Sequence, residues 1–215
     1  SRCPTRRRWS SARALLEERK EPLGNADCIK MLDCDAVDHR SIEGISFDAA
    51  LTTGRQSAFR KADLLSLEQF EVTDMSRENL SWRLGHGTQS FHMYPVLPPG
   101  YRLQDGDAAV IRPPPSKADP TAQIFGNQPV YLPYMDDDRC NAAAHLAALE
   151  VALPCDKGRH LVPLFACDAE FNTLDCGRAD YVFSKLAKAA LGDRRAAEVS
   201  FHSCRVEHAC ALLAN

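Results

Sequence analysis

Apolar side chains recur along residues 46–58 at positions three or four apart, the spacing of one helix face. They are Phe47, Ala50, Leu51, Gly54 and Ala58. Residues 46–58 are therefore predicted to form a helix, capped at its start by Ser46 or Asp48, whose side-chain oxygens can accept from free backbone N–H groups.

Three later segments also predict helices. Residues 139–153 are rich in Ala and Leu and end before Pro154, which cannot continue a helix. Residues 180–191 end at Gly192. From about Ser203 onward, apolar residues again recur at helical spacing.

Short apolar runs bounded by Gly, Pro, Asn and Asp predict strands within residues 79–85, 107–120 and 128–134. The turn-rich stretch before the last of these runs is expected to be the tip of a long hairpin, although its three consecutive prolines also suit an extended linker. The expected fold class is α+β, mainly helical with a small antiparallel three-stranded sheet.

The charge distribution limits how the chain can contact nucleic acid. The 215 residues carry a net charge of -3, but residues 1–20 alone carry +5, so the remainder carries -8. A protein of this balance does not coat nucleic acid by bulk electrostatics, and any contact made by the body of the chain must use a few placed cations. The basic start resembles a targeting signal but equally suits a solvated helix.

Composition also bears on compartment and cofactors. The nine cysteines are an odd number, are scattered, and include no C-x-x-C pair, which makes a zinc site unlikely and favours reduced thiols in the nucleus or cytoplasm. No apolar run is long enough to cross a bilayer. No metal or other cofactor is expected.

The segment SFHSCRVEHACALLAN, residues 200–215, carries the most specific candidate chemistry. On a helix, His202 and Arg205 would lie on one face and could address one small target together. A guanidinium can bind two phosphate oxygens, while an imidazole can donate a hydrogen bond or move a proton. Taken alone, the pair is weak evidence for a functional site, because His and Arg are common on protein surfaces.

Two other cations precede it. Arg60 lies one turn before Asp63 in a segment rich in Leu, and a half-buried Arg there needs an anionic partner, with an ion pair to Asp63 as the structural alternative. Lys117 lies at the expected hairpin tip, where a lysine is usually only a solvated turn residue.

In this order, the three elements resemble the catalytic domain of tyrosine recombinases of the phage-integrase type. The family pattern G-x-R-x-x-E-L is matched by AFRKADL, with Ala58 for Gly and Asp63 for Glu, and SFHSCRVEHACALLA resembles the H-x-x-R segment with its following helix. The resemblance covers about residues 45–215 and is closest to divergent eukaryotic, transposon-like members. It divides the chain into a basic stub, residues 1–45, and a partial catalytic domain, residues 46–215.

The resemblance implies DNA recombination and integration through a phosphotyrosine intermediate, with DNA as partner and self-association on DNA. Arg60 and Arg205 would hold the nonbridging oxygens of a phosphodiester, and Asp63 would brace them. Lys117 would protonate the leaving 5′-oxygen, and His202 would assist proton transfer. The two guanidinium groups would replace the charge of a metal ion.

The chain departs from the family at the nucleophile. The family's Tyr follows the H-x-x-R segment, whereas the five tyrosines here all precede His202. The expectation is a C-terminally truncated, inactive fragment. Two alternatives stay open: a non-catalytic DNA-binding remnant, and a helical interaction module whose His and Arg are surface groups.

Overall fold

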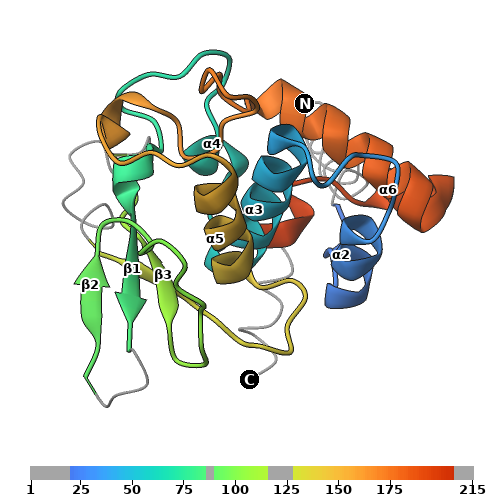
Figure 1. The fold of residues 1–215 in the computed structure, drawn as a ribbon. Helices are drawn as coiled ribbons and strands as arrows, with labels where there is room; N and C mark the ends of the chain where they lie inside the picture. Colours follow the sequence, from blue (N-terminus) through green and yellow to red (C-terminus); the bar gives the residue numbers. More distant parts are fainter. Residues whose placement is uncertain (1–19, 86–89, 116–127, 206–215) are drawn as a thin grey trace, which may run out of the picture.

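The computed structural model describes residues 20–85, 90–115 and 128–205, which form helices around a small sheet (Figure 1). The α-helices are α2 (Asn25–Leu32), α3 (Ile42–Ser57), α4 (Lys61–Leu64), α5 (Ala142–Ala152) and α6 (Cys176–Glu198). The strands are β1 (Leu80–Leu84), β2 (His92–Tyr94), β3 (Ala108–Ile111) and β4 (Val130–Pro133). Two short 3₁₀ helices are η1 (Arg77–Asn79) and η2 (Arg159–Leu161).

The sheet has the order β2-β1-β3-β4 and every pairing is antiparallel. The predicted α+β class is thereby confirmed, but the predicted number of strands is wrong, because the described residues form four strands rather than three. The additional strand, β2, is three residues long and lies at a sheet edge with His92 and Met93 exposed. An exposed edge strand of that length carries no apolar run by which a sequence pattern could reveal it.

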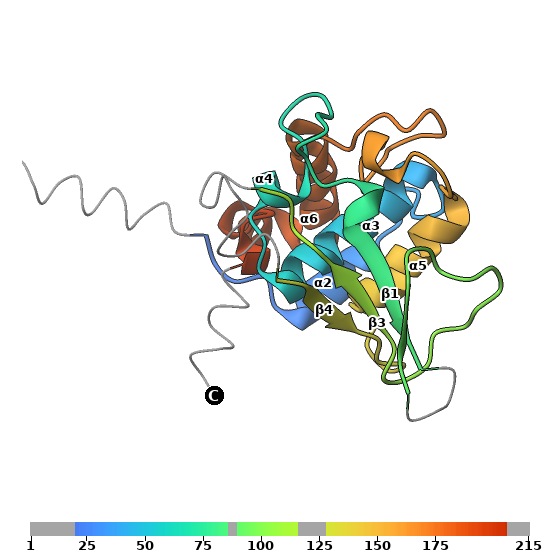
Figure 2. The same cartoon turned by 90° about the vertical axis from the view of Figure 1, so that its left-hand side faces the viewer.

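The helices form two layers behind the sheet. Trp82, Ala109 and Leu132 lie on the inner sheet face and are fully buried or nearly so, and α3 and α5 pack against this side. Figure 2 shows the sheet in front of these two helices, with α2 and α6 farther back. Leu23 and Met31, from the segment of α2, are fully buried in the same core.

Helix α3 begins earlier than its apolar spacing predicts. Ser41 is the N-cap, and its side chain accepts from Gly44 N at 3.1 Å. The expected caps are wrong: Ser46 and Asp48 are buried inside the helix, where Ser46 donates to Ala166 O and Asp48 binds His39. The helix ends at Ala58, whose φ of 57° lies in the left-handed region.

Both later helices predicted from the sequence are present, with different bounds. Helix α5 is capped by Asn141 and stops just before Pro154. Helix α6 starts earlier than expected, after the N-cap Asp175, and continues past Gly192, whose φ of 79° and ψ of 163° break the helix into two pieces. Of the last predicted helix, residues 203–205 are helical and the rest lies outside the described residues.

Candidate functional site

Arg60 lies between α3 and α4, as the N-cap of α4, and is exposed. The expected half-buried environment is therefore wrong, and Arg60 needs no anionic partner for burial. Its backbone N–H donates to Asp63 Oδ2 at 3.1 Å. Asp63 thus fixes the backbone that carries the guanidinium, and no carboxylate of the described residues forms an ion pair with that guanidinium.

The H-x-x-R segment follows α6 and is anchored by Phe201. The Phe201 ring packs against Phe47 and Phe183, with ring centroids 6.4 Å and 6.3 Å apart. Beyond this anchor the chain turns, and Arg205 N donates to His202 O at 3.1 Å. His202 is exposed and Arg205 is half-buried, so both can be reached from outside.

The segments that carry Arg60 and His202 meet at the last turn of α3. A Cβ placed on Gly54 would lie 3.2 Å from Phe201 Cε1 and 3.3 Å from Leu64 Cδ1. The absence of a side chain at Gly54 therefore allows α4 and the Phe201 anchor to approach the same part of α3. The structure brings together the two arginine-bearing segments, while Lys117 lies outside the described residues.

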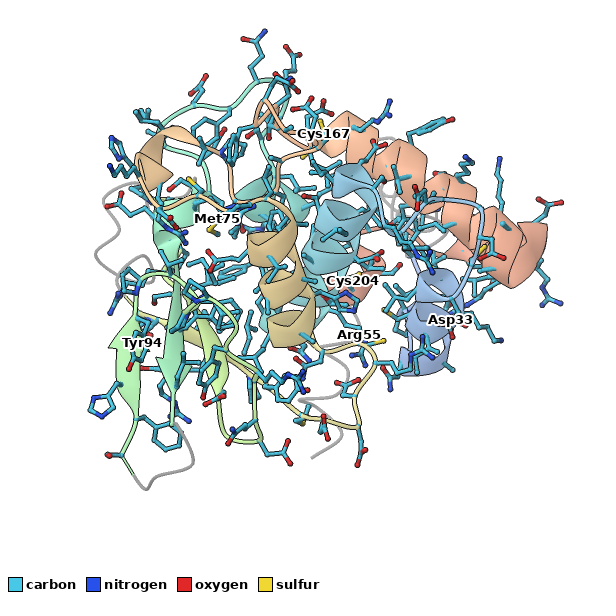
Figure 3. The ribbon with its side chains drawn as sticks, viewed as in Figure 1. Asp33, Arg55, Met75, Tyr94, Cys167 and Cys204 are labelled. Carbon is cyan, nitrogen blue, oxygen red and sulfur yellow. The ribbon has the colours of Figure 1, made fainter. Side chains whose placement is uncertain are left out.

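A third guanidinium, from Arg55, lies at this end of α3, and sequence patterns did not single it out. Figure 3 shows Arg55 and Cys204 at the end of α3 that faces α2. Burial raises the pKa of Cys204 to about 12, and the positive charge of Arg55 opposes that rise. Arg55 is half-buried, and its Nε has no hydrogen-bond partner among the described residues. In the sequence, Arg55 follows Leu51 by four residues, and this spacing indicates a shared helix face but no functional role.

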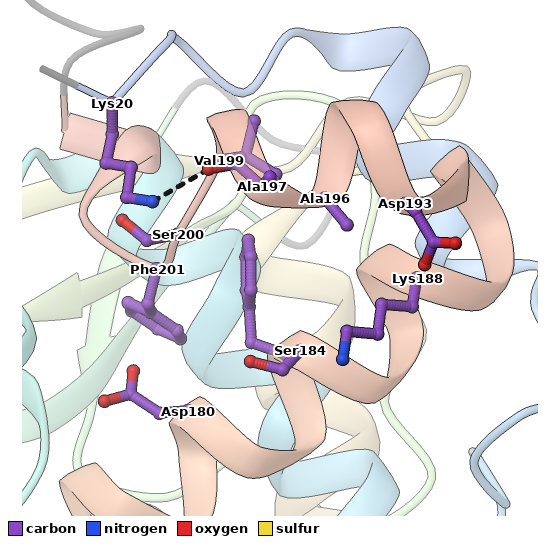
Figure 4. A pocket seen from close by; sticks show the side chains of 11 residues that line it. Lys20, Asp180, Ser184, Lys188, Asp193, Ala196, Ala197, Val199, Ser200 and Phe201 are labelled. Carbon is purple, nitrogen blue, oxygen red and sulfur yellow. Dashed lines mark hydrogen bonds between the residues drawn. The ribbon is translucent and has the colours of Figure 1, made fainter. Parts of the chain in front are cut away.

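A pocket of about 410 Å³ adjoins the same segments (Figure 4). Phe183 and Phe201 line it together with charged groups from both pieces of α6. Lys20 borders it and donates to Ala197 O at 2.9 Å. Asp180, also in its wall, pairs with Lys61, the residue after Arg60. The pocket is therefore linked to the start of α4 through the Lys61–Asp180 ion pair, and Phe201 in its wall directly precedes His202.

A buried charge cluster lies away from this surface, between α5 and the sheet. Glu150 Oε1 accepts from Arg159 Nη2 at 2.8 Å and lies 3.9 Å from Arg77 Nη1. Glu150 Oε2 accepts from Trp82 Nε1 and from Leu97 N, each at 2.9 Å. Arg77 is fully buried, and this burial lowers its pKa to about 10. The cluster ties α5 to β1 and is closed to solvent, which makes it structural.

The described residues offer no preformed metal site, since none of their groups of three or more His, Cys, Asp or Glu side chains could hold an ion. The seven cysteines in these ranges are free thiols. None of the described helices has the length and apolar character that crossing a membrane requires.

Comparison with known proteins gives no assignment: the chain matches no family model, no curated protein and no solved structure.

Proposed function

We propose that this chain binds the phosphodiester backbone of DNA where α3 ends and α4 begins, a region that we call the α3–α4 corner. We propose this corner as part of a strand-transfer site of the tyrosine recombinase type. The proposal is supported by one observation above all. Arg60 and the His202–Arg205 turn, remote in the sequence, are carried by segments that both pack on Gly54. Cations carried by two segments that meet on α3 suit a single anionic group.

Each residue has a role in this proposal. Arg60 and Arg205 bind the nonbridging oxygens and stabilise the charge that builds on them as phosphorus is attacked. His202 donates to the phosphate or moves a proton, and Lys117 supplies the proton for the leaving 5′-oxygen. Asp63 positions Arg60 through the backbone hydrogen bond to its carboxylate.

The nucleophile distinguishes binding from cleavage. Recombinases of this type attack with a Tyr after the H-x-x-R segment, and all five tyrosines of this chain precede His202. We therefore propose DNA binding, without strand cleavage, as the function of these 215 residues. A nicked suicide DNA substrate tests this division: the expected result is binding without a covalent protein–DNA adduct, and a covalent adduct would contradict it.

Binding is tested by titrating a fluorescent duplex with the wild-type chain and with Arg60→Ala and Arg205→Ala at several salt concentrations. Each variant is expected to bind more weakly and to lower the slope of log K against log salt by about one, because one phosphate contact is lost. The matched control is Arg40→Ala, which removes the same charge from an exposed residue at the opposite end of α3. If all three variants bind alike, the α3–α4 corner is not the DNA site.

A further inference from the structure

The outer face of the sheet, away from α3 and α5, carries large exposed side chains. Alternation along the strands places Met93, Arg83 and Ala108 in one cross-strand row and Ser81, Val110 and Tyr131 in the next. The β3 members of these rows, Ala108 and Val110, are buried, so the exposed groups lie on the flanking strands. Phe91, Met93 and Tyr131 are 45%, 47% and 50% exposed. Exposed aromatic and thioether groups gathered on one sheet face, unlike single scattered ones, indicate a contact surface.

This face holds its rings in fixed positions. The ring of Phe91 lies over two glycines of neighbouring strand ends, because a Cβ at Gly85 would be 2.9 Å from Phe91 Cε1 and one at Gly106 would be 3.7 Å from Cζ. The guanidinium carbon of Arg83 lies 4.1 Å from the Phe91 ring centroid and 5.7 Å from that of Tyr131. The need to cover the two glycines explains the position of Phe91. It does not explain why the guanidinium of Arg83 lies near two exposed rings.

The charge of Arg83 is not neutralised within the described residues. Its Nη2 donates to Gly106 O at 2.9 Å, its Nε is buried without a partner, and none of the described carboxylates forms an ion pair with it. Another exposed Arg–Tyr pair behaves differently: Arg178, 5.8 Å from the Tyr181 ring, is paired with Glu43. The sheet face therefore has both ring surfaces and a positive charge that no carboxylate among residues 20–85, 90–115 and 128–205 pairs with.

We propose that this aromatic face, formed by Arg83, Phe91, Met93 and Tyr131, binds the unpaired bases of single-stranded DNA. Stacking on aromatic and guanidinium planes accepts every base, and the positive charge of Arg83 complements the phosphates. Duplex DNA hides the planes of its bases, so the face selects single strands. The choice of DNA rests on the proposed function, and β4, which carries Tyr131, continues the β3–β4 connection that contains Lys117.

The test compares a fluorescent oligothymidylate with a duplex of equal length, using the full chain. Phe91→Leu combined with Tyr131→Leu removes the ring planes but keeps apolar cover over the glycines. Tyr181→Leu is the matched control, since Tyr181 is also exposed and also lies beside an arginine. The double variant is expected to lose about tenfold or more in affinity for oligothymidylate, because each stacked base contributes about 1–3 kcal/mol. Its duplex affinity should be unchanged, and Tyr181→Leu should behave as wild type.

Crosslinking of the wild-type chain gives a second measurement that does not depend on how a variant folds. An oligothymidylate carrying 5-iodouracil is irradiated with the protein, and mass spectrometry of the digest is expected to find adducts on the peptides of Phe91 or Tyr131. Adducts elsewhere only, or equal oligothymidylate binding by wild type and double variant, overturn the proposal. If the wild type binds duplex but no oligothymidylate, the proposal for the aromatic face is contradicted and the proposal for the α3–α4 corner is not. If Arg205→Ala leaves duplex binding intact, the proposal for the corner is contradicted instead.

Discussion

The buried carboxylate of Glu150 links α5 to the sheet. Its carboxylate receives hydrogen bonds from Trp82, Leu97 and Arg159, and its exposure is only 6%. Replacing Glu150 by Ala leaves two buried guanidinium groups without a counter-charge, and breaking a buried pair in this way costs about 3–5 kcal/mol. We therefore expect Glu150→Ala to lower the free energy of unfolding by that amount in urea denaturation.

The exposed Glu68 provides the control, and Glu68→Ala should change the free energy of unfolding by less than about 0.5 kcal/mol. A loss of less than about 1 kcal/mol for Glu150→Ala would show that Arg77 and Arg159 are hydrated rather than held by this carboxylate.

His39 makes stability depend on pH. Its Nδ1 lies 2.8 Å from Asp48 Oδ2 and its Nε2 lies 3.0 Å from Cys34 O, so both nitrogens face acceptors, an arrangement that favours the protonated imidazolium. The hydrogen bond to Asp48 raises the pKa of His39, and burial opposes this rise only in part. Burial raises the pKa of Asp48, and the hydrogen bond and positive charge of His39 oppose that rise, with a smaller contribution from His145. A raised histidine pKa stabilises the fold below the ordinary value of 6.5, and this contribution is lost as pH rises through the folded pKa.

We predict that the free energy of unfolding falls as pH rises above the ordinary histidine pKa of 6.5, and that His39→Gln flattens this part of the profile. The measurement is urea denaturation at a series of pH values for both proteins. Parallel profiles for wild type and His39→Gln would mean that another group titrates in this window.

The start of α3 depends on a close approach between the helix and the connection that leads into it. A Cβ at Gly44 would lie 2.2 Å from Asp38 O and 2.8 Å from His39 Cα, both backbone atoms that cannot move alone. Gly44→Ala is therefore expected to destabilise the chain by about 1–3 kcal/mol, although Ala favours a helix interior. Gly24→Ala is the control, because nothing lies within 4 Å of a Cβ there. Equal denaturation midpoints for the two variants would contradict the close approach.

Local chemistry decided which elements could be predicted. Helix α5 has an Ala-rich body, the capping side chain of Asn141 and a proline just beyond its end, and these signals agree. The start of α3 was predicted too late because Ser46 and Asp48 resemble caps, whereas tertiary contacts hold their side chains inside the helix. Strand β2 exists only through its pairing with β1, a long-range interaction that its own three residues do not encode.

At the level of the whole molecule, the order of residues along the chain suggested some members of the candidate site, whereas others come near it only through tertiary packing. Arg60, His202 and Arg205 were proposed from their order in the chain, and α3 provides the surface on which their segments meet. Arg55 joins them only because α3 ends beside Cys204. The cluster around Glu150 likewise depends on how α5, β1 and η2 pack together, so no spacing in the sequence indicates it.

The central claim is that Arg60 and Arg205 address one phosphate, and a double-mutant cycle on duplex affinity tests it most directly. Residues that share one partner are coupled, whereas independent sites add within about 0.3–0.5 kcal/mol. For Arg60→Ala, Arg205→Ala and the combined variant, we predict a coupling free energy above that range, so that the second substitution costs less than it does alone. Additive losses would place the two arginines on separate phosphates and contradict the account.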